Sequence, residues 1–366
     1  MDGAAPTNGV PAAPRLAEEN PFYSDAILNA ARDHLGDDRV RVVRLPNILV
    51  PIRPTRLGHL VPAIATWVHR LGPLGTPRFD AGDPAAAATE LIAAMDGDRP
   101  GRRILEFPYL PLDGAVASAL RKEAERQGRP VTILDAHRRA VLRRASTDVA
   151  GGMTAKKRKE LARQRRRLGE MGALTIEHVT AADALPGALA DFFALEASGW
   201  KGRRGTALAL RPAEKAFAEA AVAEAGARGD VAIHAIRLDG KAIAMLVSFR
   251  SGDTAVTWKI AYDEALGRYS PGVHVMLAAS EWLQADPAIA VVDSLAIADH
   301  PMVDHLWPDR LAIGMLVIGP RGGSAAYRLG IALARLELRL RPLARRAVHA
   351  LRKKLRRSAA AATPAG

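Results

Sequence analysis

The chain has 366 residues, of which 49% are hydrophobic and 25% charged, as expected for a globular protein of about two domains. Cysteine is absent, which excludes disulfides, thiolate metal sites and a cysteine nucleophile. The net charge of +13 is concentrated in residues 156–167 and 321–366, and the rest of the chain is net acidic. The composition therefore does not indicate a general nucleic-acid-binding surface, and each basic segment needs a local explanation.

The first half alternates helices and strands, which indicates an α/β or α+β domain. Residues 1–20 are rich in Ala, Pro and Gly and are predicted to be disordered, with no signal peptide. Ser24 is the expected N-cap of the first helix and Gly36 its expected stop. We predict helices at 24–35, 84–96 and 114–127, and strands at 40–45, 48–52, 104–110 and 130–136.

The second half begins with a basic helix that is capped by Thr154 and ends near Met171. The dipeptide Asp239-Gly240 is a strong hairpin signal between two apolar strands. A third strand follows, and then a loop leads into another helix. We predict helices at 183–199, 212–227 and 273–284, and strands at 173–179, 231–238, 241–249, 255–262, 290–297 and 311–319.

Hydrolase, P-loop and metal chemistry find little support. Neither the G-x-S-x-G elbow nor the G-x-x-x-x-G-K-[ST] loop is present. His300, Asp304 and His305 share the loop DHPMVDHLW, but two histidines and acids on a loop are more typical of capping than of coordination. We therefore predict no metal site.

The order of elements in the second half is that of a GNAT domain. The matching segments are MTAKKRKELARQRRRL (153–168), FFALEASGWKGRRGTAL (192–208), DGKAIAMLVSFRSGD (239–253) and WKIAYDEALGRYSPGVHVMLAASEWL (258–283), extended by VVDSLAI (291–297) and the Trp307 segment. On these segments the chain resembles the GNAT acetyltransferases of the CelD type, which are related to FemAB-like transferases. The resemblance covers residues 150–320 well and residues 20–145 more loosely.

The resemblance implies an α/β fold of tandem GNAT-like modules, with a mixed, largely antiparallel sheet flanked by helices and a basic C-terminal helix. The expected divisions are a disordered segment 1–20, a degenerate GNAT-like module 21–150, a GNAT acyltransferase module 151–320 and a basic amphipathic tail 321–366. The implied activity is cytoplasmic N- or O-acyl transfer from acyl-CoA (acetyl-CoA) to a small-molecule or glycan acceptor in polysaccharide, such as exopolysaccharide, or envelope metabolism. Two alternatives stay open: a FemAB-like aminoacyl-tRNA-dependent transferase, and a non-catalytic accessory protein of polysaccharide synthesis.

The predicted pyrophosphate loop is Arg268-Tyr269-Ser270-Pro271-Gly272, which stands in place of the Gly-rich loop of ordinary GNAT enzymes. Ser270 as N-cap and Pro271 at the first helical position are also features of any well-formed helix start. Phosphate binding needs exposed N–H groups, close approach and a nearby cation. Gly272 and Arg268 meet the last two needs.

The segment EASGWKGRRG (196–205) is predicted to shape the acceptor pocket. Glu196 is a candidate proton acceptor and Trp200 a candidate wall of the pocket. Lys201 and Arg203 are candidate ligands for an anionic acceptor. The alternative is an ordinary helix C-terminus, where basic residues complement the helix dipole.

Asp293 interrupts the apolar strand VVDSLAI, so its carboxylate is either a general base in a polar cleft or paired. Tyr262 and Tyr269 are candidate general acids for the departing thiolate, or packed tyrosines. Direct attack by the acceptor needs no covalent enzyme intermediate, in agreement with the missing cysteine.

Both basic segments are predicted to be helical. Helix 156–171 has either a solvated face or a polyanionic partner. In the tail, leucines recur at steps of three and four and trace one apolar stripe, and Pro342 is expected to interrupt the helix. The stripe either packs on the catalytic module or on a second chain, or it binds an anionic membrane surface through 324–357 on the inner face of the membrane. Nucleic acid is disfavoured, because no basic face continues elsewhere. The stripe consists of Leu329, Leu333, Leu336, Leu340, Leu343, Ala347, Leu351 and Leu355.

Overall fold

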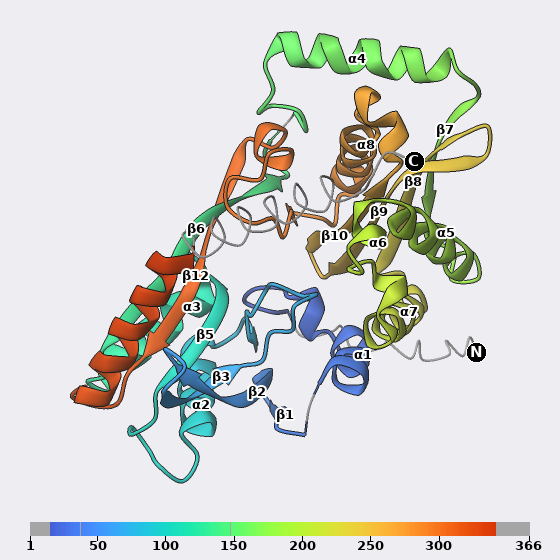
Figure 1. Cartoon of the computed structure of the whole chain (residues 1–366). Helices are drawn as coiled ribbons and strands as arrows, with labels where there is room; N and C mark the ends of the chain where they lie inside the picture. The colour runs from blue at the N-terminus through green and yellow to red at the C-terminus, as the bar shows by residue number, and fades with distance from the viewer. Residues whose placement is uncertain (1–14, 37, 147, 342–366) are drawn as a thin grey trace, which may run out of the picture.

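The computed structural model describes residues 15–36, 38–146 and 148–341, which fold around one large, twisted sheet with helices on both faces (Figure 1). None of the helices in these ranges is long and apolar enough to cross a membrane. The strands are β1 Arg41–Leu45, β2 Ile48–Leu57, β3 Val61–Thr66, β4 Arg78–Phe79, β5 Leu105–Pro111, β6 Val131–Arg143, β7 Leu174–Val179, β8 Val231–Leu238, β9 Lys241–Ser251, β10 Thr254–Tyr262, β11 Val291–Asp293 and β12 Asp309–Ile318. The α-helices are α1 Asp25–Leu35, α2 Pro84–Asp96, α3 Ala115–Arg126, α4 Ala155–Gly169, α5 Leu185–Ser198, α6 Trp200–Arg203, α7 Pro212–Gly226 and α8 Pro271–Ala285, followed by helix 325–341.

The two halves of the sheet repeat one topology. Each half has three antiparallel strands, then a helix, then a strand that pairs in parallel with the third strand. The series is β1, β2, β3, α2 and β5 in the first half, and β8, β9, β10, α8 and β11 in the second. The predicted α/β fold with tandem modules and a largely antiparallel sheet is thus confirmed.

The last strand of each half pairs with strands of the other half. The order across the sheet is β1-β2-β3-β5-β12-β6-β11-β10-β9-β8-β7, so β12 lies between two strands of the first half. The end of β6 in turn pairs with β11, with Val141 opposite Asp293. Neither of the predicted units 21–150 and 151–320 therefore contains a complete sheet, and a fragment that ends near residue 150 would lack the strand between β5 and β6.

Three hydrophobic cores cover the sheet. The largest runs through both halves beneath α1, α2, α3, α5 and α7, and it includes Phe22, Trp67 and Phe217. The second lies beneath α4 and α8 on the opposite face of the second half, where α4 contributes Leu161 and Leu168. The third joins helix 325–341 to the first half.

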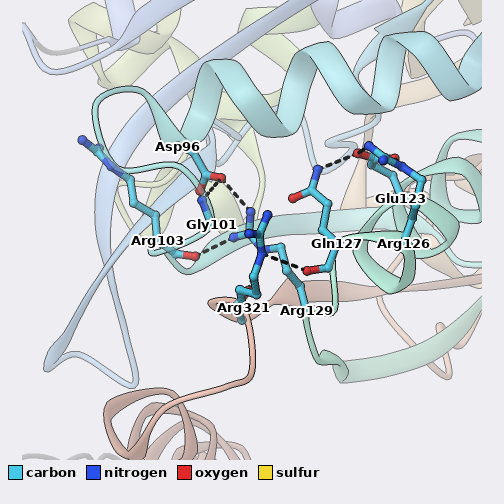
Figure 2. Close-up of polar contacts among 9 residues, drawn as sticks. Asp96, Gly101, Arg103, Glu123, Arg126, Gln127, Arg129 and Arg321 are labelled. Atoms are coloured by element: carbon cyan, nitrogen blue, oxygen red, sulfur yellow. Dashed lines mark hydrogen bonds and ion pairs between the residues drawn. The ribbon is translucent and has the colours of Figure 1, made fainter.

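A buried ion pair fixes the chain between β12 and helix 325–341 (Figure 2). The guanidinium of Arg129, which is fully buried, contacts Asp96 at 2.8 Å and donates to the carbonyls of Arg103 at 2.6 Å and Gly319 at 2.7 Å. Arg321 then continues the attachment, because its N–H donates to the carbonyl of Gly101 at 2.7 Å.

Local signals placed most elements within a few residues. Ser24 and Thr154 cap α1 and α4 as predicted. The strand predicted at 290–297 is much shorter, because Leu295 has φ 53° and turns the chain out of the sheet. The prediction missed β3 and β4. It was also wrong for residues 15–20, which are ordered: the N–H of Ala17 donates to the carbonyl of Phe79 at 2.9 Å. Residues 1–14 and Pro342 with the sequence beyond it lie outside the described part of the chain.

Candidate functional site

A split between β10 and β11 opens the sheet of the second half. The two strands pair only over Thr254–Val256 and Val291–Asp293, and β10 then continues to Tyr262 paired with β9 alone. A bulge between Thr257 and Lys259 alters the direction of β10 directly after the last pair. Beyond this pair, no strand of the described ranges lies against this side of β10, so an extended ligand can bind between the two strands.

The N-terminus of α8 lies beside this split and lacks a side-chain cap. Ser270 occupies the N-cap position with φ 55°, a conformation that is uncommon for a residue other than glycine, and its side chain makes no capping hydrogen bond. The predicted N-cap position of Ser270 and the place of Pro271 at the start of the helix are thus confirmed, but the side chain of Ser270 does not cap the helix. Within the described ranges, the N–H of Gly272 has no hydrogen-bond acceptor. Strain and a free donor at the same turn are typical of a functional site.

In the first half, the equivalent helix α2 has a side-chain cap at its N-terminus. The side chain of Asp83 caps α2 and accepts from the N–H of Ala86 at 2.9 Å. This carboxylate adds a negative charge where a phosphate would approach. The comparison favours α8, and not α2, as the anion-binding helix.

Positive charge gathers around the start of α8. The guanidinium of Arg268 lies over the ring of Tyr269, 4.7 Å from its centroid. The basic helix α4 packs against the short helix Glu264–Tyr269 that precedes the turn. Burial, and then the charge of Arg165 on α4, lower the pKa of His274 to about 4, and the Nε2 atom of this buried histidine has no partner among the described residues. The basic helix thus contributes to this site.

Three predicted acceptor-site residues and the candidate general acid Tyr262 meet around one small cavity. Glu196, Trp200, Lys201 and Tyr262 line it together with Glu264, and its volume is about 30 Å³. Trp200 and Tyr262 are 43% and 39% exposed and form its open side. A cavity of this size holds only a few water molecules, so an acceptor must displace these two side chains to enter.

Both predicted cations of this segment are already paired. The Nζ atom of Lys201 lies 2.7 Å from Glu196 and donates to the carbonyl of Ile260 at 3.1 Å. Arg203 pairs with Glu264, which also accepts from the N–H of Trp200. These contacts hold α6 against β10, and they leave little positive charge free for an anionic acceptor.

Glu196 is also engaged at both carboxylate oxygens. One oxygen binds Lys201 and the other accepts from the N–H of Leu208 at 2.7 Å. Its side chain is buried, so it positions Lys201 and the chain after α6. The geometry does not support the prediction that Glu196 accepts a proton from the acceptor.

Asp293 is paired and lies away from the cavity. It contacts the buried guanidinium of Arg139 on β6, and its second oxygen accepts from the N–H of Leu295 at 3.0 Å. Arg139 also donates to the carbonyl of Pro73 at 3.0 Å. Of the two readings of Asp293, the structure supports the paired carboxylate, which joins the two halves of the sheet.

Lys259 is a further candidate that sequence reasoning missed. It follows the bulge of β10, and its ammonium lies 5.6 Å from the centroid of the Trp258 ring without an ion pair to a described carboxylate. Burial, and then the charge of Lys201, lower its pKa to about 8; the carboxylate of Glu196 opposes this shift, and Arg70 adds to it by a smaller amount. A half-buried lysine with a pKa near neutrality is able to accept a proton.

Several other residues face Lys259. Arg70 contacts Glu214 on α7, which also pairs with Arg211 at 3.2 Å. The neighbouring His69 is buried with both ring nitrogens unpartnered within the described chain, and burial followed by the charge of Lys259 lowers its pKa to about 3. His69 is therefore neutral. A periodicity argument could not have found this group, because its members come from four separate segments.

The loop of His300, Asp304 and His305 is stabilised by hydrogen bonds within the loop. The Nδ1 atom of His300 accepts from the N–H of Met302 at 3.3 Å, and Asp304 accepts from the N–H of His300 at 2.8 Å. In the described ranges no group of three His, Cys, Asp or Glu residues is placed to bind a metal ion.

Solved structures of similar fold support the architecture. The C-terminal domain of a protein assigned as lysylphosphatidylglycerol synthetase from Agrobacterium fabrum has a TM-score of 0.55 at 14% identity, over 86% of this chain and 92% of that one. A conserved protein of unknown function from Bacteroides thetaiotaomicron has a TM-score of 0.53 at 14% identity, over 82% and 91%. At these identities the likeness concerns the fold.

Sequence comparison places the family signal on the second half. No curated protein matches the chain. Residues 155–300 match the family profile of the Acetyltransferase (GNAT) domain, and this range runs from α4 through the split and α8 to the loop after β11. This part of the chain is therefore similar to a GNAT acetyltransferase domain, and it lies within a larger sheet that the first half completes.

Proposed function

We propose that the protein transfers an acyl group from acyl-CoA, with the CoA pyrophosphate at the N-terminus of α8. The observation that carries this proposal is the uncapped turn at Ser270, with the free N–H of Gly272 beside Arg268 and α4, in a domain that matches the GNAT family. A helix N-terminus with free donors and nearby cations binds phosphate groups. The matching helix of the first half is blocked by Asp83, so one acyl-CoA binds per chain.

The pantetheine arm of the donor then lies in the split between β10 and β11. It is extended and forms hydrogen bonds with backbone groups of β10, in the manner of an added strand. This places the thioester near the bulge at Lys259 and beside the cavity of Trp200 and Tyr262. The two ends of the donor thus meet two features that a closed, fully paired sheet would lack.

Transfer needs one proton acceptor and one proton donor. The acceptor nucleophile attacks the thioester carbonyl, the C–S bond breaks, and the proton of the nucleophile passes to the neutral amine of Lys259. Tyr262 at the mouth of the cavity then protonates the departing thiolate. Tyr269 is less suited, because its ring lies beneath Arg268 and packs against the core below α8.

One observation favours a second candidate donor, an aminoacyl-tRNA. The outer face of α4 exposes Lys156, Lys159, Arg163 and Arg166, which is more positive charge than a pyrophosphate requires. An aminoacyl-tRNA donor would bind such a face through its phosphates. The acceptor in either case is a small molecule or a glycan with a nucleophilic amine or hydroxyl.

One pair of substitutions tests the CoA site. Ser270→Asp adds a carboxylate at the turn, as Asp83 does in the first half, and Ser270→Asn has the same shape without the charge. Both residues tolerate the left-handed conformation. Calorimetry with acetyl-CoA should show binding by the unmodified protein, at least tenfold weaker binding by Ser270→Asp, and a smaller loss with Ser270→Asn. Equal affinities for all three proteins would remove this turn from the site, and no binding of acetyl-CoA by the unmodified protein would favour the tRNA donor.

A further inference from the structure

Helix 325–341 has two apolar faces. One face packs on the first half of the sheet through Tyr327, Ile331 and Ala334, which are buried. The other presents Leu329, Leu336 and Leu340, which are 53%, 52% and 48% exposed. Their spacing of seven and four residues places these leucines on one line along the helix. Three leucines of the predicted stripe are therefore exposed and a fourth, Leu333, packs against Gly58. The part of the stripe beyond residue 341 lies outside the described residues.

Arginines border the outer leucines. Arg328, Arg335 and Arg339 are exposed, and their spacing of seven and four residues sets them in a parallel row. The nearest acid on this helix, Glu337, is paired with His59 at 2.9 Å and with Arg341 at 3.1 Å. The outer surface therefore combines apolar side chains with net positive charge.

The turn between β2 and β3 extends this surface. Gly58 packs closely against Leu333 and Gly330 of the helix, which leaves no room for a side chain at this position. Leu60, two residues after Gly58 in the turn, is 61% exposed, and Arg56 donates to its carbonyl at 3.1 Å. The turn between β2 and β3 thus adds Leu60 and Arg56 to the exposed leucines and arginines of the helix.

The helix is held firmly in this orientation. The ion pair of Asp96 and Arg129 and the contacts of Arg321 fix the chain that leads into it (Figure 2). On its inner side the hydroxyl of Tyr327 lies 2.7 Å from that of Thr132. The leucines are therefore exposed by a rigid attachment to the sheet.

We propose that this outer surface, formed by Leu60, Leu329, Leu336 and Leu340 with their neighbouring arginines, binds an anionic lipid bilayer. Leucines that project from a rigid helix enter the boundary between headgroups and acyl chains, while arginines at their side pair with lipid phosphates. The sequence after residue 341 adds seven Arg or Lys residues and no acid, so the charge continues in the same sense. An apolar row beside a single-sign charge row fits such a bilayer better than a neutral protein surface.

Co-sedimentation of the full-length protein with vesicles tests the proposal. Vesicles of phosphatidylglycerol and phosphatidylcholine should bind the protein at low salt, and vesicles of phosphatidylcholine alone should not. Leu336→Gln together with Leu340→Gln should weaken binding at least tenfold, and Arg335→Gln together with Arg339→Gln should do the same. Leu45→Gln, which changes an exposed leucine on β1, is the matched control and should bind as the unmodified protein does.

Affinity for acetyl-CoA should stay unchanged in all these variants, which separates this surface from the acyl-CoA site. Full retention of vesicle binding by the leucine variant would overturn the proposal, since the contact would then be charge alone. Light scattering provides a second check: a dimer that the leucine substitutions dissociate, without any effect on vesicles, would assign the surface to a second copy of the chain.

Discussion

The ion pair of Asp293 and Arg139 stands where the two halves of the sheet meet, and removing one partner should destabilise the whole protein. Both side chains are almost fully buried, at 3% and 1% exposure. Loss of one partner from such a pair costs about 3–5 kcal/mol, because the remaining charge stays buried without compensation. This is a large part of a typical folding stability of about 5–15 kcal/mol.

The two oxygens of Asp293 have different partners, so the loss of folding stability can be divided into a contribution from the charge and one from a hydrogen bond. Asp293→Asn removes the charge but keeps an oxygen for the N–H of Leu295, whereas Asp293→Ala removes both. The alanine variant should therefore be less stable than the asparagine variant by about 1 kcal/mol, the usual net value of one hydrogen bond. Replacing both partners, with Arg139→Met and Asp293→Leu, should restore much of the stability, because no charge is then left unpaired.

Equilibrium unfolding in urea, followed by tryptophan fluorescence, measures these differences, and calorimetry with acetyl-CoA reports on the site. If Asp293 is structural, the urea midpoint falls in both single variants while the residual folded protein still turns over. An Asp293→Asn variant with an unchanged midpoint and turnover reduced a hundredfold or more would refute this reasoning. Asp293 would then be the proton acceptor that its place in the strand first indicated.

Two further predictions rest on groups whose pKa is shifted by burial. The pKa of Lys259 is lowered to about 8, so turnover should rise with pH through this value, and Lys259→Met should lose this pH dependence. The control Lys241→Met changes a lysine at an exposed strand end and should keep the pH dependence. The cost of burying the ammonium is present below pH 8 and disappears as the pH approaches 10.5, the ordinary pKa of lysine. Lys259→Met should therefore also be more stable than the unmodified protein at pH 7, and this advantage should shrink by pH 10. A stability advantage that stays constant with pH would contradict the assignment. Burial raises the pKa of Glu106 on β5 to about 7, so the native protein should lose stability as the pH rises from 4.5 to 7. Glu106→Gln should remove that loss and be the more stable protein at pH 8 but not at pH 4, and equal urea midpoints at pH 8 would refute this.

Local sequence signals were sufficient for most elements of the fold. Ser24 and Thr154 begin helices, and Asp239-Gly240 joins β8 to β9, because capping and turn chemistry depend on neighbouring residues. The place of β12 between β5 and β6 could not be read in this way, since pairing across more than 150 residues leaves no periodic trace. The cluster around Glu196 and Trp200 was predicted from one segment, and Tyr262 joins it because β10 passes beside α6.

The prediction was less successful where the role of a residue depends on a distant partner. Asp293 is an isolated acid in an apolar strand, and nothing near it in the sequence points to Arg139. Lys259 has the same difficulty, because its pKa depends on Lys201 and Arg70 from other elements. The leucine stripe of the tail was recognised, but two apolar faces on one helix made it unclear which face packs.

The exchange of strands between the halves has a consequence for synthesis on the ribosome. The partners Val131 and Ile318 are 187 positions apart in the chain, and at roughly 5–20 residues per second β12 emerges on the order of ten to forty seconds after β6. Throughout this interval the facing edges of β5 and β6 have unpaired backbone groups, which attract other strands. The sheet can therefore close between β5 and β6 only after β12 has been synthesised.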